Sequence, residues 1–439
     1  MVYMDYLKLN LKKLVSIDTT NPPGNESEAV HYLATLFDAE GIEYETFEPL
    51  PGRGSIVARI RGTGSARPLM LLGHLDVVTA NAADWTHPPF SAAENDSAIW
   101  GRGTLDMKGL VATWLTLMVK YKREQAVFPR DIIFAATADE EAGGHLGLGW
   151  LVKNRPDLVD CEWALNEGGG NSFTLNGKTF ATIQSGEKAG CPVKLLAKGT
   201  AGHASIPLPD NPVIKLAEAL RSLHEAVFPE HMTDTVRAFL SGLSGGLGGS
   251  HGAALNLAVK AGQVGKAVDL AVKDPFLRAG LRAMMQNTAV PTMLSASSKL
   301  NVIPKEATAE LDCRILPGQS RESLLHELRG VLPADVEIMN ERCGEPSESS
   351  PNSPLSMIIG DVMKSHLPEA HVIPFLSPGA TDARYLRPRG TIVYGFSPML
   401  PGEKVNLAHG VDERISLASL EFGLKVLDDV VSRAARTHR

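Results

Sequence analysis

The chain has 439 residues, enough for two or three domains, and its 44% hydrophobic and 21% charged residues can build a large globular core. The net charge of −7 leaves no basic footprint for nucleic acid or for an anionic membrane. No stretch approaches the ~20 apolar residues of a membrane span, and the first residues lack a signal-peptide pattern, so we expect a cytoplasmic protein unless an upstream targeting segment has been removed.

The predicted elements of the first 170 residues alternate between helices and strands. Amphipathic helices are expected at 4–16, 26–40, 107–122 and 147–153. Two alternating strands are expected at 42–47 and 55–60, and three mainly apolar, buried strands at 69–72, 131–138 and 161–165. Unbroken apolar runs are typical of strands that are buried on both faces. The order of these elements predicts an α/β fold with a doubly wound, mostly parallel sheet.

The pattern changes near residue 186. Strands are expected at 188–198, 292–298, 307–314 and 336–342, with helices at 212–228 and 320–332. Between them lie loosely patterned helices around a Gly-rich stretch, at 229–290. The chain ends with a helix, a strand and a closing helix, at 355–365, 391–396 and 416–433. We therefore expect an α+β, ferredoxin-like domain, 187–345, inserted into a catalytic domain that is formed by 1–186 and 346–439.

The four cysteines lie far apart in the sequence, and no two of them form a C-x-x-C pair. They are Cys161, Cys191, Cys313 and Cys343. In so long a chain this spacing favours reduced thiols over a disulfide framework or a zinc knuckle.

Polar side chains follow each buried strand of the first domain: His74, Asp76, Glu140, Glu141 and Glu167. Asp106 stands just before a predicted helix, where an N-cap role is the simpler interpretation. In open α/β sheets, ligands bind outside the carboxyl ends of the strands. The topology therefore predicts that these carboxylates and the imidazole meet at one edge of the sheet.

A cluster of carboxylates and histidines suits Zn²⁺, Co²⁺ or Mn²⁺ better than Mg²⁺ or Ca²⁺, which prefer oxygen ligands. Two metal ions that share one bridging carboxylate need five protein ligands, and five residues can supply them: His74, Asp106, Glu141, Glu167 and His409. One acid of the pair at 140 and 141 is then free to act as general base. The reaction class that this arrangement implies is hydrolysis of an amide or an ester.

Several segments together resemble the M20 metallopeptidase family, which includes aminoacylase-1, carboxypeptidases G2 and S, acetylornithine deacetylase and succinyl-diaminopimelate desuccinylase. They are GHLDVV (73–78), GRGTLDMKG (101–109), ADEEAGG (138–144), NEGGG (166–170), KGTAGHAS (198–205), NVIP (301–304), ATDARY (380–385) and AHG (408–410). The resemblance covers nearly the whole chain in order. The longer lid and the run TMLSASSKLNVIP resemble the carboxypeptidase S-like branch, which includes N-acyl-amino-acid hydrolases.

The resemblance implies a role for each residue of the metal cluster. Asp106 would bridge two ions, with His74 and Glu167 completing one site. The other site would be completed by Glu141 and His409. Glu140 would be the general base and proton shuttle, and Asp76 the carboxylate behind the first histidine.

The resemblance also implies that the inserted domain is a lid and a dimerisation surface, so that a homodimer is expected. His203 would reach an active site to stabilise the oxyanion, and Asn301 and Arg314 would contact substrate, the arginine by a bidentate grip on a carboxylate. The segment TDAR, 381–384, admits two interpretations. It is either a structural turn with an ion pair or a place where Arg384 binds substrate or supports the site.

The expected enzyme cleaves the amide bond between an acyl or aminoacyl group and an amino acid with a free carboxylate, in an N-acyl amino acid or a short peptide. One alternative is a dipeptidase or a biosynthetic deacylase of the acetylornithine or succinyl-diaminopimelate type. A second alternative is a non-catalytic binding module on the same fold. The complete set of five ligands and a base argues against the second alternative.

Overall fold

The computed structural model describes residues 2–340 and 342–438, apart from the side chains of 270, 271 and 276. A mixed sheet of ten strands forms the centre of the larger domain. Along the sheet the order is β1 (Glu43–Phe47), β2 (Ser55–Ile60), β6 (Arg130–Thr137), β3 (Ala66–His74), β7 (Trp163–Asn166), β19 (Ile392–Gly395), β9 (Lys178–Glu187) and β17 (Ser347–Glu348). Two further strands, β8 (Ser172–Leu175) and β18 (Ala370–Ser377), pair with β9. The central pairs β6–β3, β3–β7 and β7–β19 are parallel, which confirms the predicted sheet.

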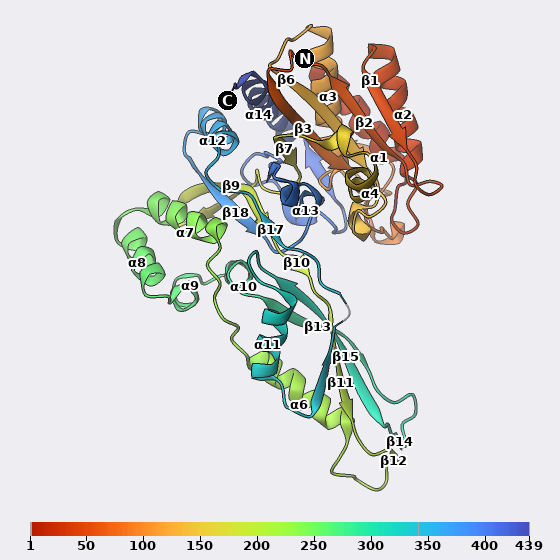
Figure 1. The fold of residues 1–439 in the computed structure, drawn as a ribbon, viewed down its shortest axis with the longest axis vertical. Coiled ribbons are helices and arrows are strands. Elements are labelled where there is room, and N and C mark those ends of the chain that lie inside the picture. The colour runs from red at the N-terminus through yellow and green to blue at the C-terminus, as the bar shows by residue number, and fades with distance from the viewer. Residues whose placement is uncertain (1, 341, 439) are drawn as a thin grey trace.

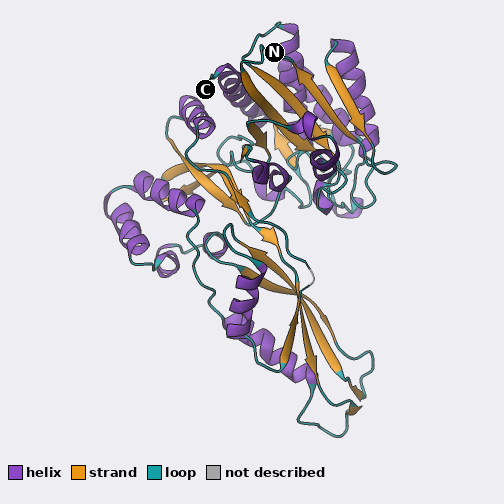
Figure 2. Cartoon of the chain, in the orientation of Figure 1, coloured by secondary structure: helices purple, strands orange, loops and turns teal. Residues whose placement is uncertain are grey.

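Helices cover both faces of this sheet, so the fold is doubly wound (Figures 1 and 2). One face carries α1 (Val2–Ser16), α2 (Glu26–Glu40), α3 (Lys108–Arg123), α12 (Pro354–His366) and α14 (Leu417–Arg436). The other carries the shorter α4 (Leu148–Asn154), α5 (Pro156–Val159) and α13 (Ala383–Leu386). The apolar run 69–72 of β3 has no exposed side chain because alternate residues belong to the two opposite core clusters.

A small antiparallel sheet beside the main one brings the chain back to its N-terminal half. It consists of β4 (Ala93–Asn95), β5 (Ala98–Trp100) and β20 (Arg414–Ser416). Four 3-10 turns lie in the loops of this domain: η1 (Ala82–Asp84), η2 (Glu140–Ala142), η3 (Arg387–Arg389) and η4 (Val405–Leu407). Because β20 pairs with β5, the loop just before β20 is held next to the loop that follows β5.

The inserted domain is an antiparallel sheet with two helices and extends away from the main sheet (Figure 1). Its strands are β10 (Ala189–Gly190), β11 (Val193–Lys198), β13 (Thr288–Ser295), β15 (Glu306–Ile315) and β16 (Val336–Met339). Helices α6 (Pro212–Glu225) and α11 (Arg321–Val331) share a buried core with this sheet. We call this inserted domain the lid. The short pair β12 (Gly202–His203) and β14 (Val302–Ile303) forms its tip.

Four helices between residues 230 and 290 form a separate layer, which we call the helical layer. They are α7 (Asp234–Leu247), α8 (Gly249–Lys260), α9 (Val264–Ala271) and α10 (Pro275–Ala283). Their core includes Phe180 of β9 and Ile373 of β18, so the layer packs against the edge of the main sheet. The core of this layer also includes Leu316, which follows β15, so the layer lies between the main sheet and the inserted domain to which the sequence analysis assigns it.

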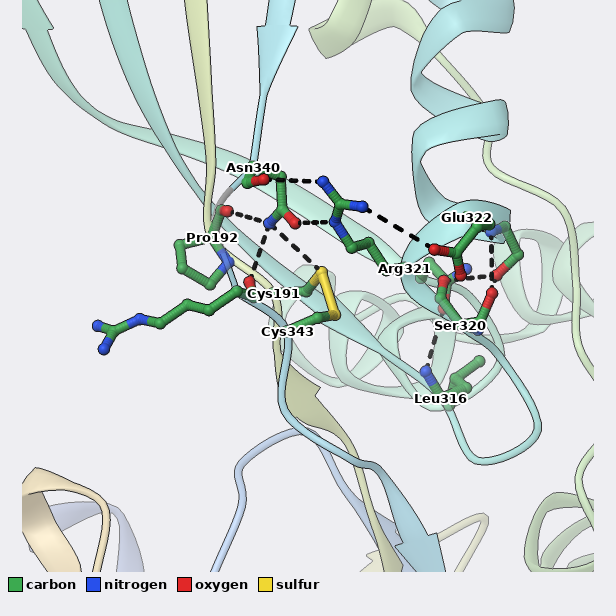
Figure 3. Close-up of a disulfide and its surroundings, with 11 residues drawn as sticks. Cys191, Pro192, Leu316, Ser320, Arg321, Glu322, Asn340 and Cys343 are labelled. Carbon is green, nitrogen blue, oxygen red and sulfur yellow. Dashed lines mark hydrogen bonds and ion pairs between the residues drawn. A yellow bond between two sulfur atoms is a disulfide. The ribbon is translucent and has the colours of Figure 1, made fainter. Parts of the chain in front are cut away.

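The expectation that all four cysteines are reduced is wrong for two of them. Cys191 and Cys343 form a disulfide at the base of the lid, where the chain enters and leaves the inserted domain (Figure 3). The two residues are 152 positions apart, and their spacing gave no sign of contact because the fold alone brings the two crossings together. Cys161 and Cys313 are free and buried, as expected. Among the described residues, every helix is too short or too polar to cross a lipid bilayer.

Candidate metal centre

The ends of three neighbouring parallel strands bring the predicted polar residues to one edge of the main sheet. His74 is the last residue of β3 and lies opposite Thr137, the last residue of β6. The acidic turn η2 follows β6, and Glu167 follows β7 directly. The apolar parts of these strands are buried in the core, so their polar ends are fixed at this edge.

One group of side chains that could hold a metal ion consists of His74, Asp106 and Glu167. The Nε2 atom of His74 lies 3.2 Å from Asp106 Oδ1 and 3.6 Å from Glu167 Oε2. The histidine side chain is only 1% exposed, and its Nδ1 donates a hydrogen bond of 2.9 Å to the backbone oxygen of Asp76. Because the ring proton is on Nδ1, the Nε2 atom of His74 can offer its lone pair to a metal ion between the two carboxylates.

A second group consists of Asp106, Glu141 and His409. The Nε2 atom of His409 lies 3.0 Å from Asp106 Oδ2 and 3.2 Å from Glu141 Oε1. His409 comes from the loop after η4 and has a left-handed φ of 61°. The two oxygens of Asp106 thus face different histidines, which is the geometry of a carboxylate that can bridge two cations.

The carboxylates of the cluster lie close enough together to oppose one another's ionisation. Burial and the nearby Glu167 raise the pKa of the Glu140 carboxyl well above its usual range. Burial and the nearby Asp106 raise the pKa of Glu167 to about 8. Divalent cations between these carboxylates would compensate their charge, and mixed imidazole and carboxylate donors match the preferences of zinc and its neighbours. The residues present therefore fit a pair of such ions.

The three consecutive acids after β6 point to different partners. Asp139 binds Arg53, whose Nη2 lies 2.9 Å from Asp139 Oδ1. Glu141 faces His409, whereas Glu140 has its Oε1 atom 3.7 Å from Nη2 of Arg384. The side chain of Glu140 is nevertheless only 9% exposed. The turn therefore holds one acid outside both ligand groups and beside a guanidinium.

Asp76 holds the acidic turn as well as the first histidine. Its Oδ1 atom accepts a hydrogen bond from the backbone nitrogen of Glu140, and its Oδ2 atom accepts one from that of Glu141. Asn21 donates a third bond to this carboxylate, at 2.8 Å. The carboxylate lies 3.5 Å from Nδ1 of His74, so the closer contact to that ring is the backbone oxygen of Asp76. The sequence offered no signal for Asn21 beyond its place in a turn.

The sequence analysis does not identify Glu413, which organises the loop that carries Asp106. Its buried carboxylate accepts hydrogen bonds from the backbone nitrogens of residues 103, 105 and 106 and from Arg102 Nη1. The partners are more than 300 positions apart in the chain, so no local spacing could reveal them. The pairing of β20 with β5 brings them together.

Arg384 and Asp382 lie on α13 and just before it, next to the acidic turn. Burial raises the pKa of the Asp382 carboxyl to about 7, and its Oδ2 atom accepts a hydrogen bond from Thr137. The Nε and Nη2 atoms of Arg384 are buried without a hydrogen-bond partner in the described part of the chain. A guanidinium with unused donors beside Glu140 can bind a further acceptor group.

The three predicted lid residues do not lie together, because two are at the tip of the lid and Arg314 is near its base, where it pairs with Gly190 of β10. His203 and Asn301 are exposed at the tip, where His203 Nδ1 contacts the Ser205 hydroxyl at 2.7 Å. Arg314 lies on β15, and its guanidinium grips both carboxylate oxygens of Asp312, at 2.7 and 3.0 Å. The length of the inserted domain separates the tip from the ends of β3, β6 and β7 (Figure 1).

An α/β sheet with two carboxylate–histidine groups at its carboxyl edge defines a class of metallopeptidases and amidohydrolases. A sequence model of "Peptidase family M20/M25/M40" matches residues 70–433. The chain belongs to this family, which confirms the resemblance seen in its motifs, and it is a metallopeptidase or amidohydrolase of the M20 type.

Two relatives and one solved structure illustrate the similarity. A probable carboxypeptidase S-like 2 of Dictyostelium discoideum is 28% identical over 80% of this chain and 69% of its own length. The N-fatty-acyl-amino acid synthase/hydrolase PM20D1 of Homo sapiens is 27% identical over 91% of this chain and 80% of its own length. The M20 metallo-carboxypeptidase Sso-CP2 of Sulfolobus solfataricus has the same fold, with a TM-score of 0.70 at 19% identity, over 96% of this chain and 97% of that one.

Proposed function

We propose that this protein is a two-metal hydrolase that cleaves the amide bond between an acyl or aminoacyl group and an amino acid with a free carboxylate. The observation that carries the proposal is the position of Asp106, whose two oxygens face His74 and His409 separately. Glu167 completes the first ligand group and Glu141 the second. Zn²⁺ is the metal we propose, with Co²⁺ or Mn²⁺ as substitutes.

The metals, when bound, supply Lewis acidity that polarises the substrate carbonyl and makes a water molecule a better nucleophile. Glu140 takes a proton from the attacking water and delivers it to the nitrogen of the leaving amine. Burial suits this carboxylate to the task because it raises the pKa towards the working pH. Asp76 orients the turn that carries Glu140 through their backbone hydrogen bond.

Arg384 gives Glu140 a cationic neighbour, and its Nε and Nη2 atoms, which have no hydrogen-bond partner among the described residues, offer donors to a substrate oxygen. We assign substrate contacts on the lid to Asn301 and Arg314, and stabilisation of the oxyanion to His203. His203 and Asn301 lie at the tip, so they reach a metal centre only if the lid moves or if a second copy supplies them. We therefore propose a homodimer that forms through the inserted domain. We also propose that the protein acts in the cytoplasm.

The names of the relatives favour an N-acyl amino acid or a short peptide as substrate. One relative is named for carboxypeptidase S, and another for N-fatty-acyl-amino acids. The free carboxylate of either substrate class could replace Asp312 in the bidentate contact with the Arg314 guanidinium. A dipeptidase or a deacylase of the acetylornithine or succinyl-diaminopimelate type is the alternative within the same chemistry.

A substrate screen tests this proposal. Metal-free protein is reloaded with Zn²⁺, Co²⁺ or Mn²⁺ and assayed on N-acetyl amino acids, N-dodecanoyl amino acids and dipeptides, each with a free or an amidated carboxyl group. We expect release of the free amino acid, dependence on the metal, and a strong preference for the free carboxyl form. Turnover in the presence of a chelator, or equal rates on the amidated forms, would contradict the proposal.

A further inference from the structure

A cavity of about 380 Å³ lies within the helical layer, away from the metal centre. All four helices of the layer and the turn between β8 and β9 contribute to its walls. Figure 1 shows α7 beside β9 and β18 at the edge of the main sheet, with α8 and α9 further out. None of the wall residues belongs to the metal centre or to the tip of the lid.

Helix α7 separates this cavity from the main sheet. Gly242 and Gly246 allow one side of the helix to approach β18 and β9 closely, since a Cβ atom would lie 2.7 Å from Ile373 at the first glycine and 2.5 Å from Phe180 at the second. Another side of α7 presents a stripe of large apolar residues to the cavity: Val236, Phe239, Leu240, Leu243 and Leu247. The cavity is thus a compartment of the helical layer itself.

The walls are apolar except at one place. Asn176 and His251 are the two polar residues of the lining, and both are exposed to solvent. By contrast, Val236, Met284 and Met285 are at most 3% exposed. The cavity therefore has an apolar interior and a polar mouth between the β8–β9 turn and α8.

An accessible space of this size with apolar walls is unusual, because protein interiors are close-packed and have few voids larger than a water molecule. Apolar walls offer water few hydrogen-bond partners and favour apolar molecules instead. Its volume falls in the range of roughly 300–1,000 Å³ that is typical of small-molecule sites. The two methionines in the wall can adapt their shape to a flexible occupant.

We propose that this cavity binds a single aliphatic chain whose polar end lies at Asn176 and His251. The shape and chemistry suit a free fatty acid or the acyl chain of an N-fatty-acyl amino acid. The site is separate from the metal centre, so the inference goes beyond the proposed hydrolysis and does not depend on it.

Calorimetry with metal-loaded and metal-free full-length protein tests the proposal, with dodecanoate, N-dodecanoylglycine and acetate as probes. We expect one dodecanoate to bind per chain in both forms, and acetate to give no such binding. Tighter binding of dodecanoate would identify a fatty acid as the occupant, and tighter binding of N-dodecanoylglycine the acyl amino acid. Absence of saturable binding, or binding that is lost with the metal, would overturn the proposal.

Two filling variants and a matched control locate the bound chain. Ala254→Phe and Ala267→Phe place a ring in the cavity, whereas Ala253→Phe adds the same ring to α8 at a residue outside the lining. We expect the filling variants to weaken dodecanoate binding at least tenfold and the control to change it less than twofold. Equal effects of Ala254→Phe and Ala253→Phe would refute the assignment.

A photoreactive fatty acid with a diazirine on its chain supplies a readout that needs no variant. After irradiation, peptides from α7 to α10 should carry the label, and excess dodecanoate should prevent the labelling. Labelling confined to peptides around the metal centre would also overturn the proposal, without bearing on whether that centre hydrolyses amides.

Discussion

The metal centre and the tip of the lid are both polar sites, but they are built in opposite ways. The centre lies where buried parallel strands end, and its supporting carboxylates, Asp76 and Glu413, have no exposed surface. The tip stands on antiparallel strands in solvent, and its residues His203 and Asn301 are exposed. The candidate metal centre is therefore fixed by the core of the fold, whereas the substrate contacts that we propose on the lid depend on movement or on a second subunit.

The largest effect is expected at the shared ligand. Asp106→Ala removes the one carboxylate that contacts both histidines, so both metal sites should weaken together. We expect metal content to fall below one ion per chain and metal-dependent turnover to become undetectable. Elemental analysis and activity measurements check this, with the exposed Asp84→Ala as control in a neighbouring loop. Loss of one ion alone would argue against a bridging role.

Glu140→Gln tests whether the acid outside both ligand groups is the base. The amide cannot take a proton, so kcat should fall by roughly 10²–10⁴, the usual contribution of general acid–base catalysis. Metal content should stay unchanged because this residue is not among the ligands. If kcat persists, the proton must be handled by another group and our assignment of the base is wrong.

Glu413→Gln tests the support of the Asp106 loop. A glutamine amide replaces one of the two oxygens that together accept four hydrogen bonds, so the loop should lose its fixed position. We expect metal affinity to fall about 10–100-fold, as is typical when a group that orients a ligand is lost. Competition with a chelator measures this, and excess metal should restore turnover. The exposed Glu421→Gln serves as the control.

Arg314→Ala tests the lid side of the comparison. We expect KM for substrates with a free carboxylate to rise about tenfold or more, with little change in kcat and no change in metal content. Amidated substrates should be insensitive. Arg321→Ala, which removes a lid guanidinium bound to Asn340, is the matched control. Unchanged kinetics would remove the basis for carboxylate recognition by this residue.

The smallest expected effect is on the pH dependence of the free energy of unfolding. It involves one buried lysine in the catalytic domain and one at the base of the lid. Burial lowers the pKa of Lys108, in the catalytic domain, and of Lys188, at the base of the lid, from 10.5 to about 7. Between these values the unfolded chain binds more protons than the native one, so the free energy of unfolding should rise with pH.

Lys188→Met or Lys108→Met should reduce this slope by up to about 1.4 kcal/mol per pH unit for each lysine. Denaturant unfolding at pH 7.5 and pH 9.5 measures the slope. The exposed Lys178→Met should leave it unchanged. A slope that is identical in wild type and in both buried variants would show that these amines are already charged in the native state.

The sequence was sufficient to predict the sheet and the convergence of its polar ends, because buried parallel strands leave unbroken apolar runs such as 69–72. It could not reveal Glu413 or Asn21, whose partners come close only through the pairing of distant strands. It missed the disulfide between Cys191 and Cys343 for the same reason. The contact of the helical layer with β9 and β18 was not predicted, because amphipathic spacing shows that a face is buried but not against which partner.

A crystal structure of the zinc-loaded protein, with anomalous diffraction recorded at the zinc edge, tests most directly whether two metal ions share Asp106. We predict two peaks per chain, both in contact with Asp106, one also bound by His74 and Glu167 and the other by Glu141 and His409. A single peak, or two peaks that do not share Asp106, would contradict the central claim.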